Sequence, residues 1–176
     1  RYMSGVLLKN HRLDEARDEA IEAILAEPFN PAARGALVDW ARDTRTPLGF
    51  PRIDIPPRDS LNRGRAAPAY DSVRREWRGT RGHDSPFARQ YPADSIYRES
   101  LAEEAEALRA AAASGDSTVS TANIRRLADA GELESYIFFA RASAGISRDY
   151  AGYFQDHHDA LRRFWLEYVI GAKYVK

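Results

Sequence analysis

Apolar residues recur at helical spacing from the start of the chain, and no stretch alternates in the way of a β-strand. Met3, Val6 and Leu7 fall at three- and four-residue steps, as do the apolar positions of residues 13–24. Residues 10–11, Asn and His, separate the two patterns. The pattern therefore predicts two short amphipathic helices joined by a tight turn.

Prolines set the bounds of the second helix and of a third. Pro28 has no amide proton and restricts the residue before it, so the second helix ends by Glu27. Asn30 followed by Pro31 supplies a helix cap and a favourable first position. We expect the third helix to cover residues 31–43.

The pattern is less regular beyond residue 43. Repeated prolines exclude a long helix from residues 44–68, where scattered isoleucines predict a packed, extended connector. In the helix predicted from residue 94 or 95 to 113, the side exposed to solvent is expected to be formed by Glu99, Glu103, Glu104 and Glu106. The remaining helices are predicted at residues 69–78, 94 or 95 to 113, 120–130, 132–144 and 147–170.

The spacing of small residues before Pro28 resembles a tetratricopeptide repeat. In that family each unit of about 34 residues pairs two antiparallel helices through small residues. A proline ends the second helix of the unit. Here Ser4 and Gly5 are the small residues of the first helix, Ala16 and Ala23 make the close contacts, and Pro28 is the stop. The resemblance covers residues 1–30, and residues 31–43 look like the start of a second unit.

The resemblance implies an all-α fold, in which a tetratricopeptide-like hairpin precedes an irregular helical bundle of the α-α superhelix type. We expect a hairpin region at 1–43, an Arg/Pro-rich connector at 44–92 and a helical bundle at 93–176, together forming one compact domain. Because arrays usually need at least about three units, we also expect further repeats before Arg1, or a homo-oligomer.

The resemblance also implies a function, which is non-catalytic binding of a protein or peptide in a groove, as in a scaffold or adaptor. The groove would be lined by the inner faces of the first and third helices. Gly5 stands where peptide-clamping members of the family have asparagine, so capture of a terminal carboxylate is not expected. The groove residues that the resemblance implies are Gly5, Leu8, Lys9, Gly35, Asp39, Arg42 and Asp43.

Composition excludes several classes of protein. The chain has 176 residues, no cysteine, and no apolar run long enough to span a bilayer, so we expect a soluble protein without disulfides, either cytoplasmic or exported. Its 26 basic and 26 acidic residues cancel, which removes a general attraction for nucleic acid or acidic membranes. Lysine occurs only at Lys9, Lys173 and Lys176, and this preference for arginine, with abundant alanine, indicates a GC-rich bacterial genome.

The charge is nevertheless uneven along the chain. Residues 45–92 hold ten basic and five acidic groups, with arginines and aromatics interleaved between residues 63 and 91. Arginine and aromatic side chains bind phosphates and stack on bases, so a nucleic-acid-binding domain is an alternative. The same arginines could instead pair with the carboxylates of residues 14–27 or 99–106. We favour this docking, since the net charge is zero.

No catalytic motif accompanies the titratable residues. His83 lies in a turn beside an aspartate, and His157 and His158 are adjacent, so they diverge around a helix rather than converge on a metal. We therefore expect neither an enzyme, a cofactor nor a metal site. An unrecognised active site near His83 or His157 is the second alternative.

Overall fold

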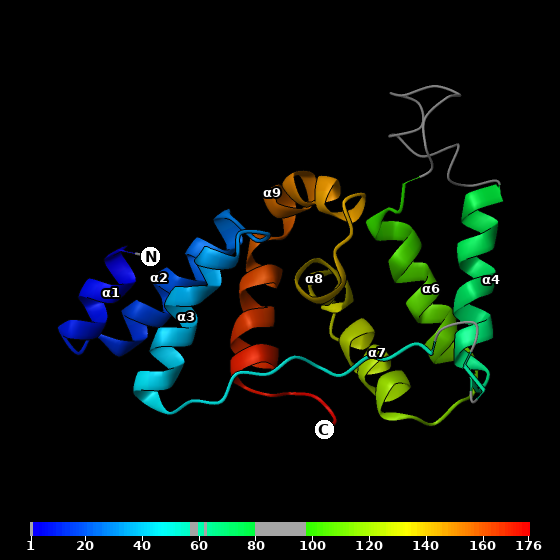
Figure 1. The fold of residues 1–176 in the computed structure, drawn as a ribbon, viewed down its shortest axis with the longest axis horizontal. Coiled ribbons are helices and arrows are strands. Elements are labelled where there is room, and N and C mark those ends of the chain that lie inside the picture. Colours follow the sequence, from blue (N-terminus) through cyan, green and yellow to red (C-terminus); the bar gives the residue numbers. More distant parts are fainter. Residues whose placement is uncertain (1, 57–59, 62, 80–97) are drawn as a thin grey trace. The chain divides into compact units, whose positions relative to one another are not determined.

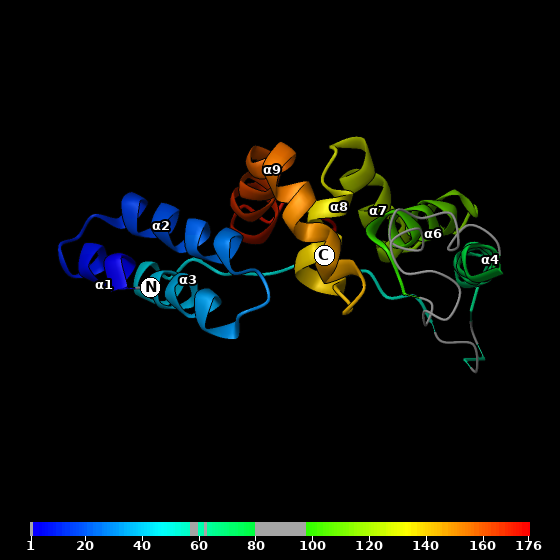
Figure 2. The same cartoon turned by 90° about the horizontal axis from the view of Figure 1, so that it is seen from above.

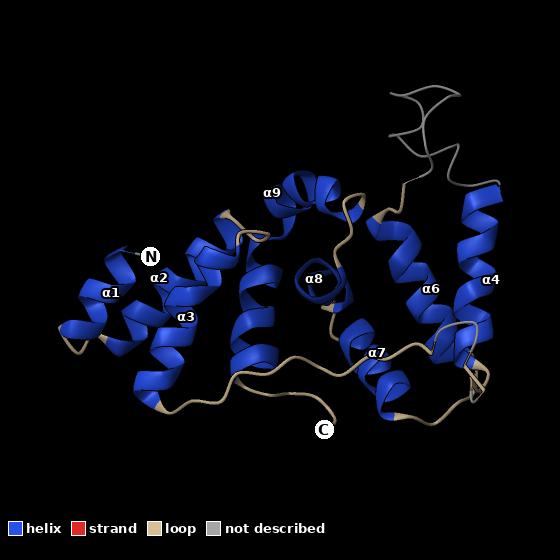
Figure 3. Ribbon diagram, viewed as in Figure 1, coloured by secondary structure: helices blue, strands red, loops and turns tan. Residues whose placement is uncertain are grey.

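The computed structural model of the chain describes residues 2–56, 60–61, 63–79 and 98–176. Within these residues the regular structure is entirely helical, which confirms the all-α prediction (Figure 3). Contacts group the chain into two compact units, one formed by residues 1–51 and 151–174 and the other by residues 52–150 and 175–176. They are called unit 1 and unit 2 below.

Unit 1 begins with the helices α1 (Tyr2–Lys9), α2 (Leu13–Ala26) and α3 (Pro31–Thr44), labelled in Figure 1. Both α1 and α3 pack against α2, and Figure 2 shows them on the same side of it. Asn30 caps α3, since its side chain accepts the N–H of Ala32 at 2.9 Å. These bounds follow the predicted ones closely.

The core of unit 1 corrects one prediction about α1. Leu7 and Ser4 are the buried side chains that α1 turns to α2, and the Ser4 hydroxyl donates to the carbonyl oxygen of Ala16 at 2.9 Å. Met3 and Val6, which were expected to share the packing face, are 56% and 36% exposed. The buried face of α1 is therefore narrower and made of smaller residues than its spacing indicates.

The last helical segment completes unit 1. Helix α9 (Ile146–Phe164) belongs to unit 1 from residue 151 onward, and it continues into the π-helix η3 (Trp165–Ile170). Phe50 packs its ring against Phe164 and Trp165, with ring centroids 6.0 and 5.6 Å apart. Phe50 thus lies against this helix, and residues 46–51 around it form no helix.

The remaining helical elements of the described residues form unit 2. They are α4 (Ala66–Gly79), α6 (Leu101–Ala113), α7 (Val119–Asp129), α8 (Leu133–Tyr136), the π-helix η2 (Ile137–Arg141) and the first residues of α9. Helices α4 and α6 lie side by side (Figures 1 and 2). The core is formed by Leu108, Ile124, Leu127, Leu133, Ile137 and Phe138, all almost fully buried.

Three helix bounds in unit 2 differ from prediction for reasons visible in the structure. Helix α4 starts at Ala66 rather than residue 69, because Asp116 accepts the N–H groups of Arg65 and Ala66. The start of α6 was expected at residue 94 or 95, but Ser100 is its cap and accepts the N–H of Glu103 at 3.2 Å.

The third difference is at the pair α8 and η2. A single α-helix was predicted over residues 132–144, whereas the α-helical part ends at Tyr136 and a π-helical turn follows to Arg141. The helical residues therefore stop before Ala142. π-Helical turns carry no composition signal of their own, so the spacing of apolar residues did not reveal this one.

Candidate functional site

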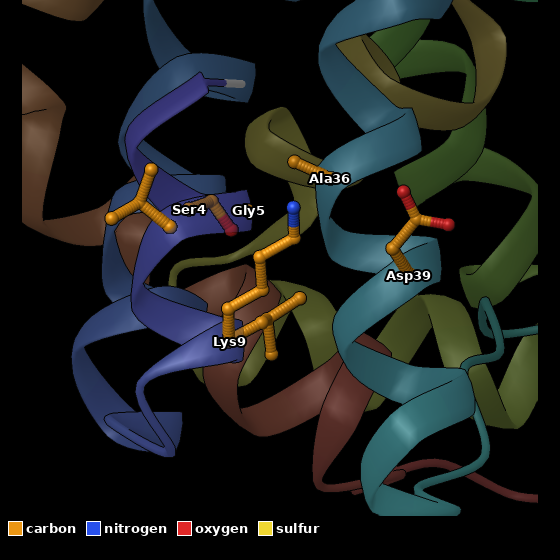
Figure 4. Close-up of a pocket in the computed structure, with 7 residues that line it drawn as sticks. Ser4, Gly5, Lys9, Ala36 and Asp39 are labelled. Atoms are coloured by element: carbon orange, nitrogen blue, oxygen red, sulfur yellow. The ribbon is translucent and has the colours of Figure 1, made fainter.

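A hollow of about 540 Å³ lies between α1 and α3 of unit 1 (Figure 4). Most of its lining residues are small or apolar, and two of them are charged, one positively and one negatively. The lining residues are Ser4, Gly5, Val6, Leu8, Lys9, Ala36 and Asp39. Its volume is within the range of about 300–1,000 Å³ that is usual for binding sites in proteins.

Gly5 leaves one wall of this hollow open. A Cβ built on Gly5 meets no heavy atom within 4 Å, so nothing in the described structure fills the space beside it. Ala36 faces the hollow from α3 and is buried, with 4% of its surface exposed. Small residues on both helices therefore create the space.

The two charged residues of the hollow differ in their partners. The carboxylate of Asp39 accepts a hydrogen bond from Arg42 Nη2 at 2.8 Å, one turn along α3. Lys9 extends from α1 into the space between the helices (Figure 4), and no described residue forms an ion pair with it. The hollow thus presents an ammonium group whose charge is not balanced by a described carboxylate.

The predicted groove residues divide between this hollow and its surroundings. Gly5, Leu8, Lys9 and Asp39 line it together. Arg42 lines a second, shallower hollow of about 410 Å³ with Val38 and Leu48, and it also lies 3.8 Å from Asp43. Gly35 and Asp43 line neither of the two hollows.

Sequence reasoning missed three residues of the lining as groove residues. Ser4 was assigned to helix packing and Val6 to the buried face, and Ala36 was not singled out. Ala36 lies three residues before Asp39, so helical spacing from a predicted groove residue was the signal that could have found it. For Val6 the sequence offers no such signal, because an apolar residue is equally suited to a core and to a groove.

A buried cluster of charges in unit 2 is the other candidate. Arg74 of α4 is 8% exposed, and its guanidinium lies 3.1 Å from Glu103 and 3.1 Å from Glu104, besides pairing with Glu99. Arg141 of η2 reaches Glu104 from the other side, with Nε 2.6 Å from Oε1. Two arginines from different helices therefore converge on the carboxylates of α6.

This cluster corrects the predicted solvent face of α6. Glu103 and Glu104 were expected in water but are 0% and 3% exposed, because α4 covers them with Arg74 and Tyr70. The docking of arginine on residues 99–106 is confirmed for Arg74. Charge counts along one helix do not show whether a complementary helix covers it.

The electrostatics of the cluster favour a fixed ionic structure over proton exchange near neutral pH. Burial raises the pKa of Tyr70 to about 12, helped by the charge of Glu104 and the hydrogen bond to it. Burial by itself would lower the pKa of Arg141, but Glu104 outweighs it and raises that pKa. Neither group is placed to act as an acid or base at physiological pH.

The described residues of the Arg-rich segment are largely committed to unit 2. Trp77 Nε1 donates to Glu106 at 3.0 Å, Tyr70 donates to Glu104 at 2.6 Å, and Arg63 pairs with Asp71. Arg75 is exposed on α4. Arg81, Phe87, Arg89 and Tyr91, which completed the predicted pattern, lie outside the described residues.

Of the two adjacent histidines of α9, His158 lies beside a carboxylate of the described structure and His157 does not. His157 is exposed at a break in α9, where its ring stacks on Tyr153 at 4.0 Å and its Nδ1 lies 3.1 Å from the Tyr153 carbonyl oxygen. His158 lies 2.9 Å from Glu22 of α2. His83 is outside the described residues. Within the described ranges no cluster of His, Asp or Glu has the arrangement of a metal site.

No helix in the described part of the chain has the length and apolarity needed to cross a membrane. Comparisons of the chain with protein-family models, with curated proteins and with solved structures give no match. The resemblance of residues 1–43 to a tetratricopeptide unit therefore stays a prediction from the sequence.

Proposed function

We propose that the hollow between α1 and α3 binds a short segment of a partner protein that carries an apolar side chain next to an acidic one. One observation carries the proposal: the hollow is open at Gly5 and contains Lys9, which has no ion-pair partner among the described residues. The chain would then act as a non-catalytic protein- or peptide-binding module.

The apolar lining of the hollow suits an apolar side chain of the ligand. Val6 and Leu8 of α1 and Ala36 of α3 present hydrocarbon surface, and the space beside Gly5 is wide enough to admit a side chain. Burial of apolar surface contributes roughly 25 cal/mol per Å². An aliphatic side chain of the partner would therefore supply most of the affinity.

The two charged residues of the hollow favour an acidic side chain in the ligand. Asp39 already has Arg42 as a partner, so a cationic ligand gains little there, whereas a carboxylate would pair with Lys9. An exposed ion pair contributes about 0.2–1 kcal/mol. We therefore assign the carboxylate to selectivity and orientation and the apolar side chain to affinity.

The arrangement of the helices supports a tetratricopeptide-type groove. Both α1 and α3 pack on α2, which leaves their other faces to form the two sides of one hollow. Helices held by tertiary packing lose little conformational freedom when a ligand binds. Further repeats before Arg1, or a second copy of the chain, would extend the same surface.

The experiment selects peptides on the intact chain from a displayed random library and measures their affinities by fluorescence anisotropy. Gly5→Leu fills the hollow, and Lys9→Glu reverses its charge. Gly152→Leu is the matched control for the first, because Gly152 is also helical with no atom within 4 Å of a built Cβ. Lys176→Glu, at an exposed position, is the matched control for the second.

The proposal expects acidic peptides whose affinity falls at least tenfold with Gly5→Leu and with Lys9→Glu, while both controls bind like the unmodified chain. Equal binding by Gly5→Leu would overturn the site. Combined replacement of Asp39, Arg42 and Asp43 by alanine tests the rim, since these residues form one set of ion pairs beside the hollow. We expect it to weaken binding while circular dichroism shows unchanged helicity.

The nucleic-acid alternative receives less support from the described residues. Arg74, Tyr70 and Trp77 use their polar atoms on carboxylates of α6, so they are not presented to phosphates or bases. A binding assay with single-stranded RNA at low and high salt separates the alternatives. Affinity that falls steeply with salt and is lost with Arg75→Glu would favour nucleic acid.

A further inference from the structure

Asn123 of α7 is completely buried, and the hydrogen bonds of its side chain go to main-chain atoms. Its Oδ1 accepts the N–H of Val175 at 2.7 Å, and its Nδ2 donates to the carbonyl oxygen of Val175 at 3.0 Å. The same Nδ2 lies 3.1 Å from the carbonyl oxygen of Arg52. One amide therefore closes a pair of hydrogen bonds with a single residue of an extended segment, as a neighbouring β-strand would.

Asn123 bonds the main chain of the segment and makes no hydrogen bond to its side chain. The side chain of Val175 is not enclosed, since the residue is 37% exposed. Among the described residues, Val175 and Lys176 form no hydrogen bonds except those to Asn123. Asn123 is thus the polar attachment of this end of the chain to unit 2.

A buried asparagine side chain is stable only where its amide oxygen and nitrogen both have hydrogen-bond partners. Without the segment, Oδ1 would lose the partner it has here, and a buried polar group without a hydrogen bond destabilises the fold. Any extended backbone that offers one N–H and one C=O meets the same need. A second copy of this chain necessarily carries such a segment.

We propose that Asn123 is a clamp for extended main chain, that the segment around Val175 is its tethered occupant, and that the same segment of a second copy competes for it. The tether gives the chain's own segment an effective concentration of roughly millimolar. Exchange with a second copy therefore requires that the tethered segment first leave the clamp. The proposal is independent of the hollow between α1 and α3.

The test uses the 176-residue chain with Val175→Pro, which removes the N–H that Asn123 accepts while keeping the chain length. Val175→Ala is the matched control, because it shortens the side chain and keeps the N–H. The probe is a fluorescent peptide of residues 171–176, GAKYVK, and a second probe carries N-methylvaline at position 175. Binding is measured by anisotropy.

We expect the GAKYVK peptide to bind the Val175→Pro chain at least tenfold more tightly than the unmodified or Val175→Ala chains. Adding Asn123→Ala to Val175→Pro should remove this binding, and the N-methylated peptide should not bind. The absence of peptide binding to a Val175→Pro chain with intact helicity overturns the proposal. Binding that survives Asn123→Ala overturns it as well.

A second measurement keeps the proposal testable if Val175→Pro disturbs the fold. In NMR spectra of the isotope-labelled unmodified chain, unlabelled millimolar GAKYVK should shift the main-chain amide resonance of Val175, which loses its hydrogen bond to Asn123, and leave the side-chain amide of Asn30, the cap of α3, in place. An unchanged Val175 resonance would show that the segment does not exchange, and the proposal would be wrong.

Discussion

Arg141 donates from Nε to Oε1 of Glu104 across 2.6 Å, at a place where the Glu104 side chain is only 4% exposed. The other oxygen of Glu104 accepts the Tyr70 hydroxyl at 2.6 Å and Arg74 Nη1 at 3.1 Å. One carboxylate thus joins residues of α4 and η2 through α6. We therefore expect the stability of unit 2 to depend on Glu104 more than its position on a glutamate-rich helix would indicate.

Glu104→Gln is expected to lower the free energy of unfolding by about 3–5 kcal/mol, because the buried Arg141 loses the carboxylate that it pairs with and Arg74 loses one of its three. Urea denaturation followed by far-ultraviolet circular dichroism measures the change. The amide of glutamine keeps the size of the side chain, so the effect would come from lost charge and not from a cavity.

Glu134→Gln is the control for this substitution. Glu134 pairs with Arg109, whose side chain is 49% exposed, so solvent screens the interaction. Removal of such a pair costs about 0–1 kcal/mol. Equal losses for Glu104→Gln and Glu134→Gln would contradict a special role for the buried cluster.

The phenol of Tyr70 should ionise at a higher pH than the phenol of an ordinary tyrosine. Burial and the neighbouring Glu104 raise its pKa to about 12 from 10.0. The unfolded chain releases this proton near pH 10, so the stabilisation is complete below pH 10 and is lost as the pH rises to about 12. Spectrophotometric titration of phenolate should show a late-ionising phenol that Tyr70→Phe removes; an unchanged curve would contradict the assignment.

The helices of unit 1 could be predicted because their signals are local. Pro28 stops α2, and Asn30 with Pro31 starts α3 at the expected residue. In unit 2 the start of α4 depends on Asp116, which is distant in sequence, so local pattern could not give it. The same reason explains Glu103 and Glu104, whose burial depends on a partner helix.

The candidate site was predictable only as far as a family resemblance orders the helices. That resemblance put Gly5, Leu8, Lys9 and Asp39 on facing surfaces, and the structure places them around one hollow. The resemblance itself stays a prediction from the sequence. The clamp at Asn123 had no sequence signal, because it needs main-chain atoms of residues 52 and 175 at one place.

Gly5→Ala is expected to raise the free energy of unfolding by about 0.5–1 kcal/mol, because glycine inside a helix loses more conformational entropy than alanine and the new Cβ meets no atom within 4 Å. Thermal denaturation measures it. Gly171→Ala should instead destabilise, since its Cβ would lie 2.7 Å from the carbonyl oxygen of Glu167. A loss of stability with Gly5→Ala would show that the hollow is not open there.

The contact between α2 and α9 inside unit 1 should depend on pH through His158. Its imidazole lies 2.9 Å from Glu22, with Asp159 at 3.6 Å, and Arg162 reaches the same Glu22 at 3.4 Å. The hydrogen bond to Glu22 raises the pKa of His158 above its usual 6.5. This contribution to stability is therefore complete below pH 6.5 and is lost as the pH rises through the higher pKa of the folded chain.

Glu22→Gln should lower the pKa of His158, which an NMR titration of its ring protons measures directly. The stability change should be small, because the two side chains are 38% and 45% exposed and water screens the pair. Glu19→Gln, on the exposed part of the same helix, is the matched control and should leave the titration in place. A His158 titration that is the same with and without Glu22 would mean that the imidazole is held by Asp159 and not by α2, and α9 would then lack this pH-dependent link to α2.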